Sequence, residues 1–318
     1  MYMEKNRLAI IVPCYKEEAV LAETTVRLTA ILEDQISMGM IAQNSYILYV
    51  NDGSTDETWS IISQLHDSNK YVNGVNLACN VGHQKALWAG LTVAKDNADI
   101  VVSIDADLQD DVNAIKAMVQ KYHEGCDIVY GVRNERKTDT WFKRTTALGF
   151  YKLMNAMGTK TVYNHADYRL MSKRALEYLL LFKERNLFIR GLVPLVGYKT
   201  DCVYYNRAER FAGESKYPLS KMLNFAVDGI TSFSVKPIRM IFSLGLLFMF
   251  IALCVLIWIL YSYFKGKAVP GWSSLMLSVW FCSGCVLTGL GVVGEYIGKI
   301  YIETKKRPNY NIESVLLK

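Results

Sequence analysis

The chain has 318 residues, enough for one large domain with an appendage, and its hydrophobic residues are concentrated toward the C-terminus. The 36 basic and 30 acidic residues leave a formal net charge of +6 without an arginine-rich run, so we expect no nucleic-acid partner. The seven cysteines follow no disulfide spacing, which favours reduced thiols in the cytosol. The apolar run at residues 8–12 is too short for a secretory signal.

Short apolar runs alternate with segments of helical periodicity in the first half of the chain. Strands are predicted at residues 8–12, 46–50, 72–77, 100–104 and 128–132. Helices are predicted between them, near residues 17–37, 57–65, 85–94 and 112–124. This alternation is typical of an α/β fold with a Rossmann-like, mostly parallel sheet, whose site lies at the carboxyl ends of the strands. Residues 141–211 are less regular, with helical stretches near 141–157 and 173–183.

Two long uncharged segments, 240–264 and 269–294, lie near the C-terminus. Each exceeds the roughly 20 apolar residues that a helix needs to cross a bilayer. We therefore expect a hairpin of two transmembrane helices, at about 240–264 and 272–296. Lysines and arginines flank the pair, which weakly favours both ends in the cytosol and a multi-pass protein of the cytoplasmic membrane.

The segment before the first span, residues 219–233, repeats apolar side chains at helical spacing. This pattern predicts an amphipathic helix in the membrane interface, with a core-facing helix as the alternative. The predicted organisation is a cytosolic domain at 1–212, a juxtamembrane amphipathic helix at 213–239, two transmembrane helices within 240–298 and a cytosolic tail at 299–318.

Two carboxylates one residue apart, Asp105 and Asp107, end the apolar run at 100–104. Alternate side chains of an extended segment lie on one face, so the pair can share a divalent cation such as Mg²⁺ or Mn²⁺. Such cations commonly hold a diphosphate. Together with the two membrane-length segments, the pair indicates an enzyme that takes a nucleotide-activated group from the cytosol and delivers it to a lipid.

Three further loops follow strands at the same predicted edge, at residues 12–18, 51–56 and 80–86. Each loop has a purely structural explanation, because glycine permits the turn, Ser or Thr caps the next helix and early acidic residues suit the helix dipole. Their common position beside the acid pair favours a binding site.

The combination of these motifs resembles a known family. Val-Pro-x-Tyr-x-Glu, Asn-Asp-Gly-Ser-Thr-Asp and Asp-Ala-Asp-Leu-Gln-Asp, in this order within residues 8–135, resemble the inverting family 2 glycosyltransferases of the GT-A fold. Downstream, residues 164–171, 190–192 and 210–217 resemble the polyprenyl-phosphate branch, which includes dolichyl-phosphate mannose synthases and bactoprenol glucosyltransferases. The two-span tail looks most like the bactoprenol enzymes.

The resemblance implies a membrane-bound enzyme that moves glucose from UDP-glucose onto undecaprenyl phosphate, for glycosylation of the cell envelope, O-antigen or teichoic acid. UDP-N-acetylglucosamine, UDP-galactose and GDP-mannose are the alternative donors. The resemblance also implies a metal held by Asp105, Asp107 and Gln109. It implies a nucleotide site formed by Pro13, Tyr15, Glu17, Asp52, Gly82, Lys85 and Ala106, with Asp52 near the base or ribose. The family usually has Asn where Lys16 stands, and Asp111 replaces a common Pro.

An acceptor phosphate is already anionic and needs no strong base, but it needs a cationic cradle. The candidates for this cradle are Arg133, Arg169, Arg207, Arg210, Ser215 and Lys216. Asp167 could align the acceptor or accept a proton, and a salt bridge to Arg169 is the alternative. The predicted catalytic residues are thus Asp105, Asp107, Asp167 and Arg169.

Other classes fit less well. Processive polysaccharide synthases carry a Gln-x-x-Arg-Trp motif that is absent here and need more spans. The intact acid pair argues against a non-catalytic scaffold, and in Asp-x-Asp hydrolases the pair usually follows the first strand rather than the fourth. The Gly294-x-x-x-Gly298 pattern hints at a homo-oligomer. A flippase and a downstream glycosyltransferase are further expected partners.

Overall fold

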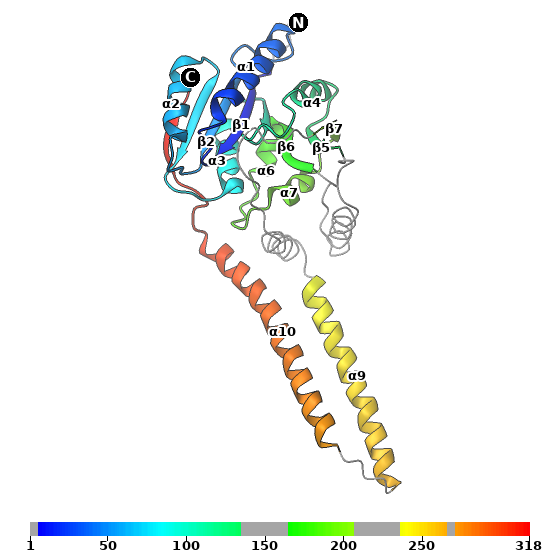
Figure 1. Ribbon diagram of the computed structural model, residues 1–318. Helices are drawn as coiled ribbons and strands as arrows, with labels where there is room; N and C mark the ends of the chain where they lie inside the picture. Colours follow the sequence, from blue (N-terminus) through cyan, green and yellow to red (C-terminus); the bar gives the residue numbers. More distant parts are fainter. Residues whose placement is uncertain (1–5, 135–164, 207–235, 266–270) are drawn as a thin grey trace. The chain divides into compact units, whose positions relative to one another are not determined.

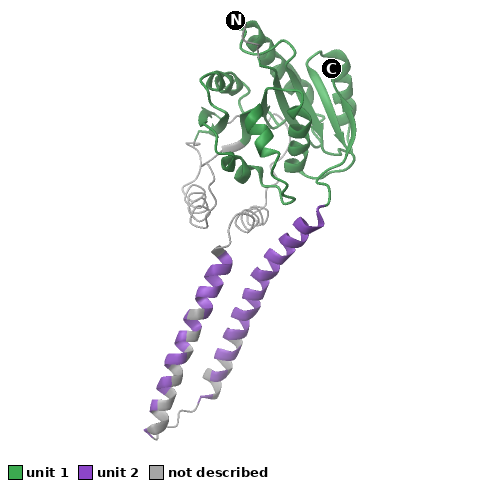
Figure 2. Ribbon diagram, turned by 180° about the vertical axis from the view of Figure 1, so that it is seen from behind, with its two compact units in different colours: residues 1–151, 160–217, 307–318 green, residues 152–159, 218–306 purple. Residues whose placement is uncertain are grey.

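The computed structural model describes residues 6–134, 165–206, 236–265 and 271–318 (Figure 1). The chain divides into two compact units, coloured separately in Figure 2. The first contains the sheet and includes residues 307–318, and the second contains two long helices within residues 218–306. The helix predicted at 141–157 and all but the last four residues of the predicted juxtamembrane helix at 213–239 lie outside the described residues.

The first unit is built on a sheet with the strand order β7-β5-β6-β4-β1-β2-β3-β8. Its strands are β1 (Leu8–Cys14), β2 (Tyr46–Asn51), β3 (Val72–Leu77), β4 (Ile100–Ser103), β5 (Ile128–Arg133), β6 (His165–Ser172), β7 (Thr200–Tyr205) and β8 (Ile312–Leu316). The neighbours β4-β1-β2-β3 are parallel, as is the pair β5 and β7, whereas β6 and β8 run antiparallel to their neighbours. The predicted α/β fold with a mostly parallel sheet is confirmed.

Helices cover both faces of the sheet, which is why the central strands are almost wholly apolar. The helices are α1 (Leu21–Ser37), α2 (Thr58–Ser68), α3 (His83–Lys95), α4 (Ala114–His123), α6 (Lys173–Leu179) and α7 (Ile189–Leu192). Leu8, Ile10 and Val12 of β1 share a buried cluster with side chains of α1, α2 and α4. Ile11, which lies between Ile10 and Val12 in β1, points to the opposite face and meets α3 at Gly90, where the two elements approach closely.

Strand β6 was not predicted, and it changes the sheet around the acid pair. It lies antiparallel between β4 and β5, with Arg169 opposite both Ser103 and Tyr130. Charged residues are rarely buried unless they are paired, so Asp167-Tyr168-Arg169 does not look like a central strand in the sequence. Because β6 enters the sheet where β4 ends, it brings Asp167 to the same edge as Asp105.

The segment predicted as a cytosolic tail, residues 299–318, contains the end of a helix and strand β8. The helix before it continues to Lys305, and β8 then pairs with the outer edge of β3. A chain of buried amides fixes this pairing, since Asn51 Nδ2 donates to Asn76 Oδ1 (2.7 Å) and Asn76 Nδ2 donates to Glu313 Oε2 (2.7 Å). Removal of the C-terminal third would therefore also remove a strand from the sheet.

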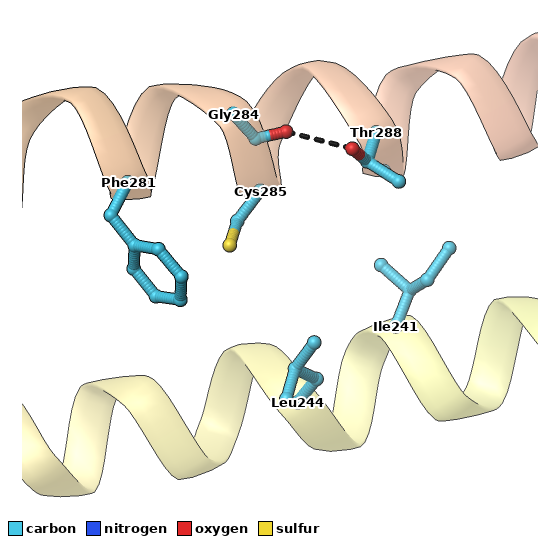
Figure 3. A pocket seen from close by; sticks show the side chains of 7 residues that line it. Ile241, Leu244, Phe281, Gly284, Cys285 and Thr288 are labelled. Carbon is cyan, nitrogen blue, oxygen red and sulfur yellow. Dashed lines mark hydrogen bonds between the residues drawn. The ribbon is translucent and has the colours of Figure 1, made fainter.

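The second unit contains α9 (Lys236–Phe264) and α10 (Trp272–Lys305), which lie side by side (Figure 3). The rings of Phe248 and Phe281 meet edge to face, with centroids 5.5 Å apart. A groove of about 460 Å³ runs between the helices and is lined by Ile241, Leu244, Phe281, Gly284, Cys285, Thr288 and Gly289. Within α10, Thr288 Oγ1 donates to the carbonyl oxygen of Gly284 (2.8 Å), which leaves this face of α10 apolar.

Large apolar side chains of both helices are exposed, for example Phe242 (68%) and Leu287 (69%). Within the part of the chain that the structure describes, one helical stretch, Phe281–Lys305, is long and apolar enough to cross a membrane by length and composition. The predicted hairpin of two spans is not confirmed by this criterion and stays a prediction.

The stability of the loops at the sheet edge can be tested at Gly53. Its φ is +59°, and a Cβ there would lie 2.4 Å from the carbonyl carbon of Cys79, which is backbone and cannot move aside cheaply. Gly125 also has a positive φ (+90°), but a Cβ there would meet only the flexible end of Lys199, at 3.9 Å. We expect Gly125→Ala to lower the free energy of unfolding by about 1 kcal/mol and Gly53→Ala to lower it by about 2 kcal/mol more.

Equilibrium unfolding in urea, followed by circular dichroism in detergent micelles, measures both variants. Gly125→Ala is the matched control for backbone strain, so the difference between the variants reports the clash alone. Equal losses in the two variants would show that the loops after β2 and β3 do not approach each other as described.

Candidate active site

The loop after β1 is tied to the loop after β2. Pro13 is buried within β1, Tyr15 is exposed and Glu17 is half-buried. The backbone N–H of Lys16 donates to Ser54 Oγ (3.0 Å), and that of Glu17 donates to Thr58 Oγ1 (3.1 Å). Tyr15 and Glu17 therefore stand on a loop whose backbone is bound to the second motif and to the start of α2.

Asp52 holds the loop that follows β3. Its side chain is buried, and its carboxylate accepts hydrogen bonds from the backbone N–H groups of Val81 (2.8 Å) and Gly82 (2.9 Å) and from Asn80 Nδ2 (3.1 Å). Charge-assisted bonds of this kind are about twice as strong as neutral ones. This role was not predicted from the sequence, and the predicted contact of Asp52 with the base or ribose stays a prediction.

The acid pair follows β4 directly. The side chain of Asp105 is 36% exposed, and Asp107 is half-buried. Between them Ala106 is buried, and its carbonyl oxygen accepts from Thr24 Oγ1 (3.0 Å), which ties the pair to α1. Gln109 is buried, and its backbone N–H donates to Asp107 Oδ1 (3.2 Å). The two carboxylates are thus held in place while remaining accessible.

Arg133, a predicted phosphate ligand, is ion-paired with Asp110. Arg133 Nε donates to Asp110 Oδ1 (3.0 Å) and Nη2 donates to Asp110 Oδ2 (3.2 Å), while Tyr205 Oη donates to Asp110 Oδ1 (2.7 Å). Asp110 and Tyr205 are buried. This network joins the loop after the acid pair to the ends of β5 and β7, so Arg133 has a structural partner that the sequence did not reveal.

Asp167 lies between two arginines. Arg169 Nη2 donates to its Oδ1 (2.6 Å), whereas Arg190 Nε donates to Oδ1 (3.1 Å) and Arg190 Nη2 to Oδ2 (3.0 Å). Burial alone would raise the pKa of Asp167, but Arg190 and Arg169 hold this pKa well below its usual range. Such a carboxylate is a weak base, which argues against the predicted role as a proton acceptor and supports the salt bridge that was its alternative.

Arg169 is completely buried, so it does not reach a ligand at the surface of the site. Its Nε and Nη1 atoms have no hydrogen-bond partner within the described part of the chain, and burial lowers its pKa. An effect of Arg169 on a reaction would therefore pass through Asp167. The other predicted acceptor residues, Arg207, Arg210, Ser215 and Lys216, lie outside the described residues and stay predictions.

His83 is a site residue that the sequence analysis missed. It is the first residue of α3, and its Nε2 lies 3.5 Å from Asp105 Oδ1 and 3.8 Å from Asp167 Oδ2. Its side chain is 43% exposed. The signal that could have identified it is its position directly after Gly82, at the start of the helix that follows the third strand. Lys85, the residue of this loop that was predicted to bind the nucleotide, lies two positions after His83 in α3 and is half-buried.

The charges at this sheet edge show whether the acid pair suits a divalent metal ion. The described segments contain no group of three His, Cys, Asp or Glu side chains arranged to hold a metal. However, Mg²⁺ is usually held by one or two carboxylates together with substrate phosphates. Burial raises the pKa of Asp105, His83 opposes this, and Asp167, Asp110 and Asp107 raise it further. A cation would relieve this crowding of carboxylates, so the acid pair fits a divalent ion shared with a diphosphate.

Comparisons with known proteins agree with this geometry. Residues 9–180 match the family model described as glycosyl transferase family 2. The chain is 55% identical over 306 residues to the uncharacterized glycosyltransferase YkoT of Bacillus subtilis (strain 168), covering 96% of this chain and 91% of YkoT. It is 44% identical over 270 residues to the bactoprenol glucosyl transferase of Shigella phage SfV, covering 84% of this chain and 87% of that protein.

Among solved structures, mannosyl-3-phosphoglycerate synthase from Rubrobacter xylanophilus matches with a TM-score of 0.48 at 15% identity, over 70% of this chain and 71% of that one. The family model spans the sheet edge with the acid pair, and YkoT matches almost end to end. On these two findings the chain belongs to glycosyl transferase family 2 and is a glycosyltransferase.

Proposed function

We propose that this enzyme transfers glucose from UDP-glucose to a polyprenyl phosphate, undecaprenyl phosphate in bacteria, at the cytosolic face of the membrane. The observation that carries the proposal is the acid pair Asp105 and Asp107 at the sheet edge, in a chain 44% identical to a bactoprenol glucosyl transferase. The product is a polyprenyl-phosphate sugar that serves glycosylation of the cell envelope.

The chemistry required is one displacement at the anomeric carbon. A phosphate oxygen of the lipid forms a bond to that carbon, the bond from the carbon to the diphosphate oxygen breaks, and UDP leaves with the electron pair. Attack from the opposite side inverts the anomeric configuration. A divalent ion bound by Asp105 and Asp107 would stabilise the charge that develops on the diphosphate.

The residues around Asp167 agree with such a displacement. The attacking phosphate is anionic, so no group must remove a proton from it. The low pKa of Asp167 between Arg169 and Arg190 is therefore no obstacle to the reaction. Asp167 instead offers a fixed carboxylate oxygen beside the acid pair, held by a bidentate guanidinium.

The connectivity of the sheet supports a hairpin of two spans. Strands β1 to β7 precede α9 and β8 follows α10, yet all belong to one sheet. The chain must therefore leave and re-enter on the same side of any membrane that the helices cross, which requires an even number of crossings. The exposed apolar side chains of α9 and α10 support the proposal that lipid surrounds these helices. The homo-oligomer, the flippase and the downstream glycosyltransferase stay predictions.

Donor and acceptor are tested with the purified full-length protein, undecaprenyl phosphate and Mn²⁺. UDP-glucose, UDP-N-acetylglucosamine, UDP-galactose and GDP-mannose are supplied in separate reactions, and the chloroform-soluble product is identified by mass spectrometry. We expect glucosyl phosphoryl undecaprenol from UDP-glucose at the highest rate. No lipid-linked sugar from any of the four donors would refute the proposal.

The acid pair is tested by Asp105→Asn and Asp107→Asn. Each change keeps the size of the side chain but removes the charge that would hold the cation, so we expect transfer to fall by about a hundredfold or more. Binding of Mn²⁺ in the presence of UDP, measured by electron paramagnetic resonance, should weaken in parallel.

Asp111→Asn is the matched control for the acid pair. Asp111 is exposed, and its carboxylate accepts only local bonds from Asn113 within the described residues. The control should keep wild-type rates. Wild-type rates in Asp105→Asn or Asp107→Asn would instead remove the metal from the proposed reaction.

The number of crossings is tested with reporters of membrane sidedness. A reporter fused after Lys318 should lie in the cytosol, because β8 belongs to the sheet. A reporter inserted at Gly271, between α9 and α10, should lie on the opposite side of the membrane. Finding both reporters on one side would contradict the hairpin.

A further inference from the structure

His83 and Asp167 face each other with one acceptor site of the Asp167 carboxylate left over. Of the three hydrogen bonds that the arginines donate to Asp167, two end on Oδ1 and one ends on Oδ2. A carboxylate offers about two acceptor sites on each oxygen. The described residues thus leave the remaining acceptor site on Oδ2, which is also the oxygen nearer to His83 Nε2, at 3.8 Å.

A distance of 3.8 Å is too long for a direct hydrogen bond. One small polar group on the open side of the pair can, however, lie within hydrogen-bond distance of both atoms. The group must donate to Oδ2 and accept from Nε2 when the imidazole proton is on Nε2. An anionic oxygen without a proton fits poorly, because it can accept from Nε2 but cannot donate to Oδ2. A neutral hydroxyl both donates and accepts, so it satisfies both partners.

The structure fixes both sides of this gap. Asp52 holds Val81 and Gly82, directly before His83 in the chain. The residue after His83, Gln84, accepts through Oε1 from the backbone N–H of Ile189 (2.8 Å), at the start of α7. The next residue of α7 is Arg190, which donates two hydrogen bonds to Asp167. Two rigid connections therefore keep the imidazole and the carboxylate facing the same space.

We propose that His83 and Asp167 together bind one hydroxyl group of the transferred sugar, which makes His83 a residue that determines donor specificity. This inference rests on the proposed function, because it assigns the sugar of the nucleotide donor to the space beside the acid pair. A hydrogen bond to a charged group contributes enough to change the relative rates of two sugars by about tenfold to a hundredfold.

The test compares the preferred UDP-sugar with its four monodeoxy analogues, lacking the 2-, 3-, 4- or 6-hydroxyl. For each analogue, the ratio of kcat/KM for the full sugar to kcat/KM for the analogue is measured in wild type and in His83→Ala. We expect this ratio to fall about tenfold or more in His83→Ala for one analogue and to stay unchanged for the others. His83→Gln, which keeps a side-chain N–H donor, should restore part of the lost discrimination.

Binding gives a second readout that does not depend on turnover. Calorimetry should show that His83→Ala binds UDP as wild type does, while the extra affinity for the UDP-sugar over UDP decreases. The matched control is His123→Ala. His123 is an exposed histidine at the end of α4, bonded through Nε2 to the carbonyl oxygen of Met40, and its removal should change neither ratio.

The outcomes separate this inference from the proposed function. Unchanged ratios for all four analogues, or UDP affinity that falls as much as UDP-sugar affinity, would overturn the role of His83 while transfer to lipid continues. Wild-type protein that forms no lipid-linked sugar at all would instead refute the proposed function itself.

Discussion

The site depends on negative charges at one sheet edge that are compensated to different degrees. Four aspartates lie around the end of β4, and three of them differ in the positively charged or polar groups beside them. Asp110 is paired with Arg133, and Asp167 lies between two arginines. Asp105 has an imidazole 3.5 Å away instead of a guanidinium, and its pKa is raised. Guanidinium groups thus compensate the charges of Asp110 and Asp167 and leave Asp105 suited to a cation that arrives with the substrate.

The Asn-Asp-Gly-Ser motif after β2 has a structural task at every position. Asn51 donates a hydrogen bond to Asn76 of β3, and Asp52 accepts hydrogen bonds from the loop at 80–82. Gly53 has no side chain, so the backbone of that loop can pass close to it. Ser54 accepts a hydrogen bond from the backbone of the loop after β1. The motif therefore joins the loops of three parallel strands. A substitution there would change activity by displacing these loops, even without touching the nucleotide.

The strands that could be predicted from the sequence are β1 to β5. Four of them are mostly apolar because both faces of a buried parallel strand are apolar, whereas β3 reads Val-Asn-Gly-Val-Asn-Leu. Strand β6 could not be predicted, since its buried Asp167 and Arg169 are charged. Asp167 is compensated there by Arg169 and Arg190, and Arg169 is compensated by Asp167. Strand β8 could not either, because its partner β3 lies more than two hundred residues earlier and no local pattern records that pairing. The acid pair was visible as a motif, whereas His83 becomes a site residue only when β6 places Asp167 opposite it.

The position of β8 in the sheet also affects how the enzyme would work on a lipid. In the proposed function the attacking phosphate is confined to the membrane surface, so the active site must face that surface repeatedly for turnover. A single connection to one span would leave the domain free to turn away. Here the chain is tied to the helix pair twice, before α9 and through the short stretch 306–311 between α10 and β8. If the helices cross a membrane as proposed, two connections would restrict the domain more than one and would raise the effective concentration of acceptor at the site.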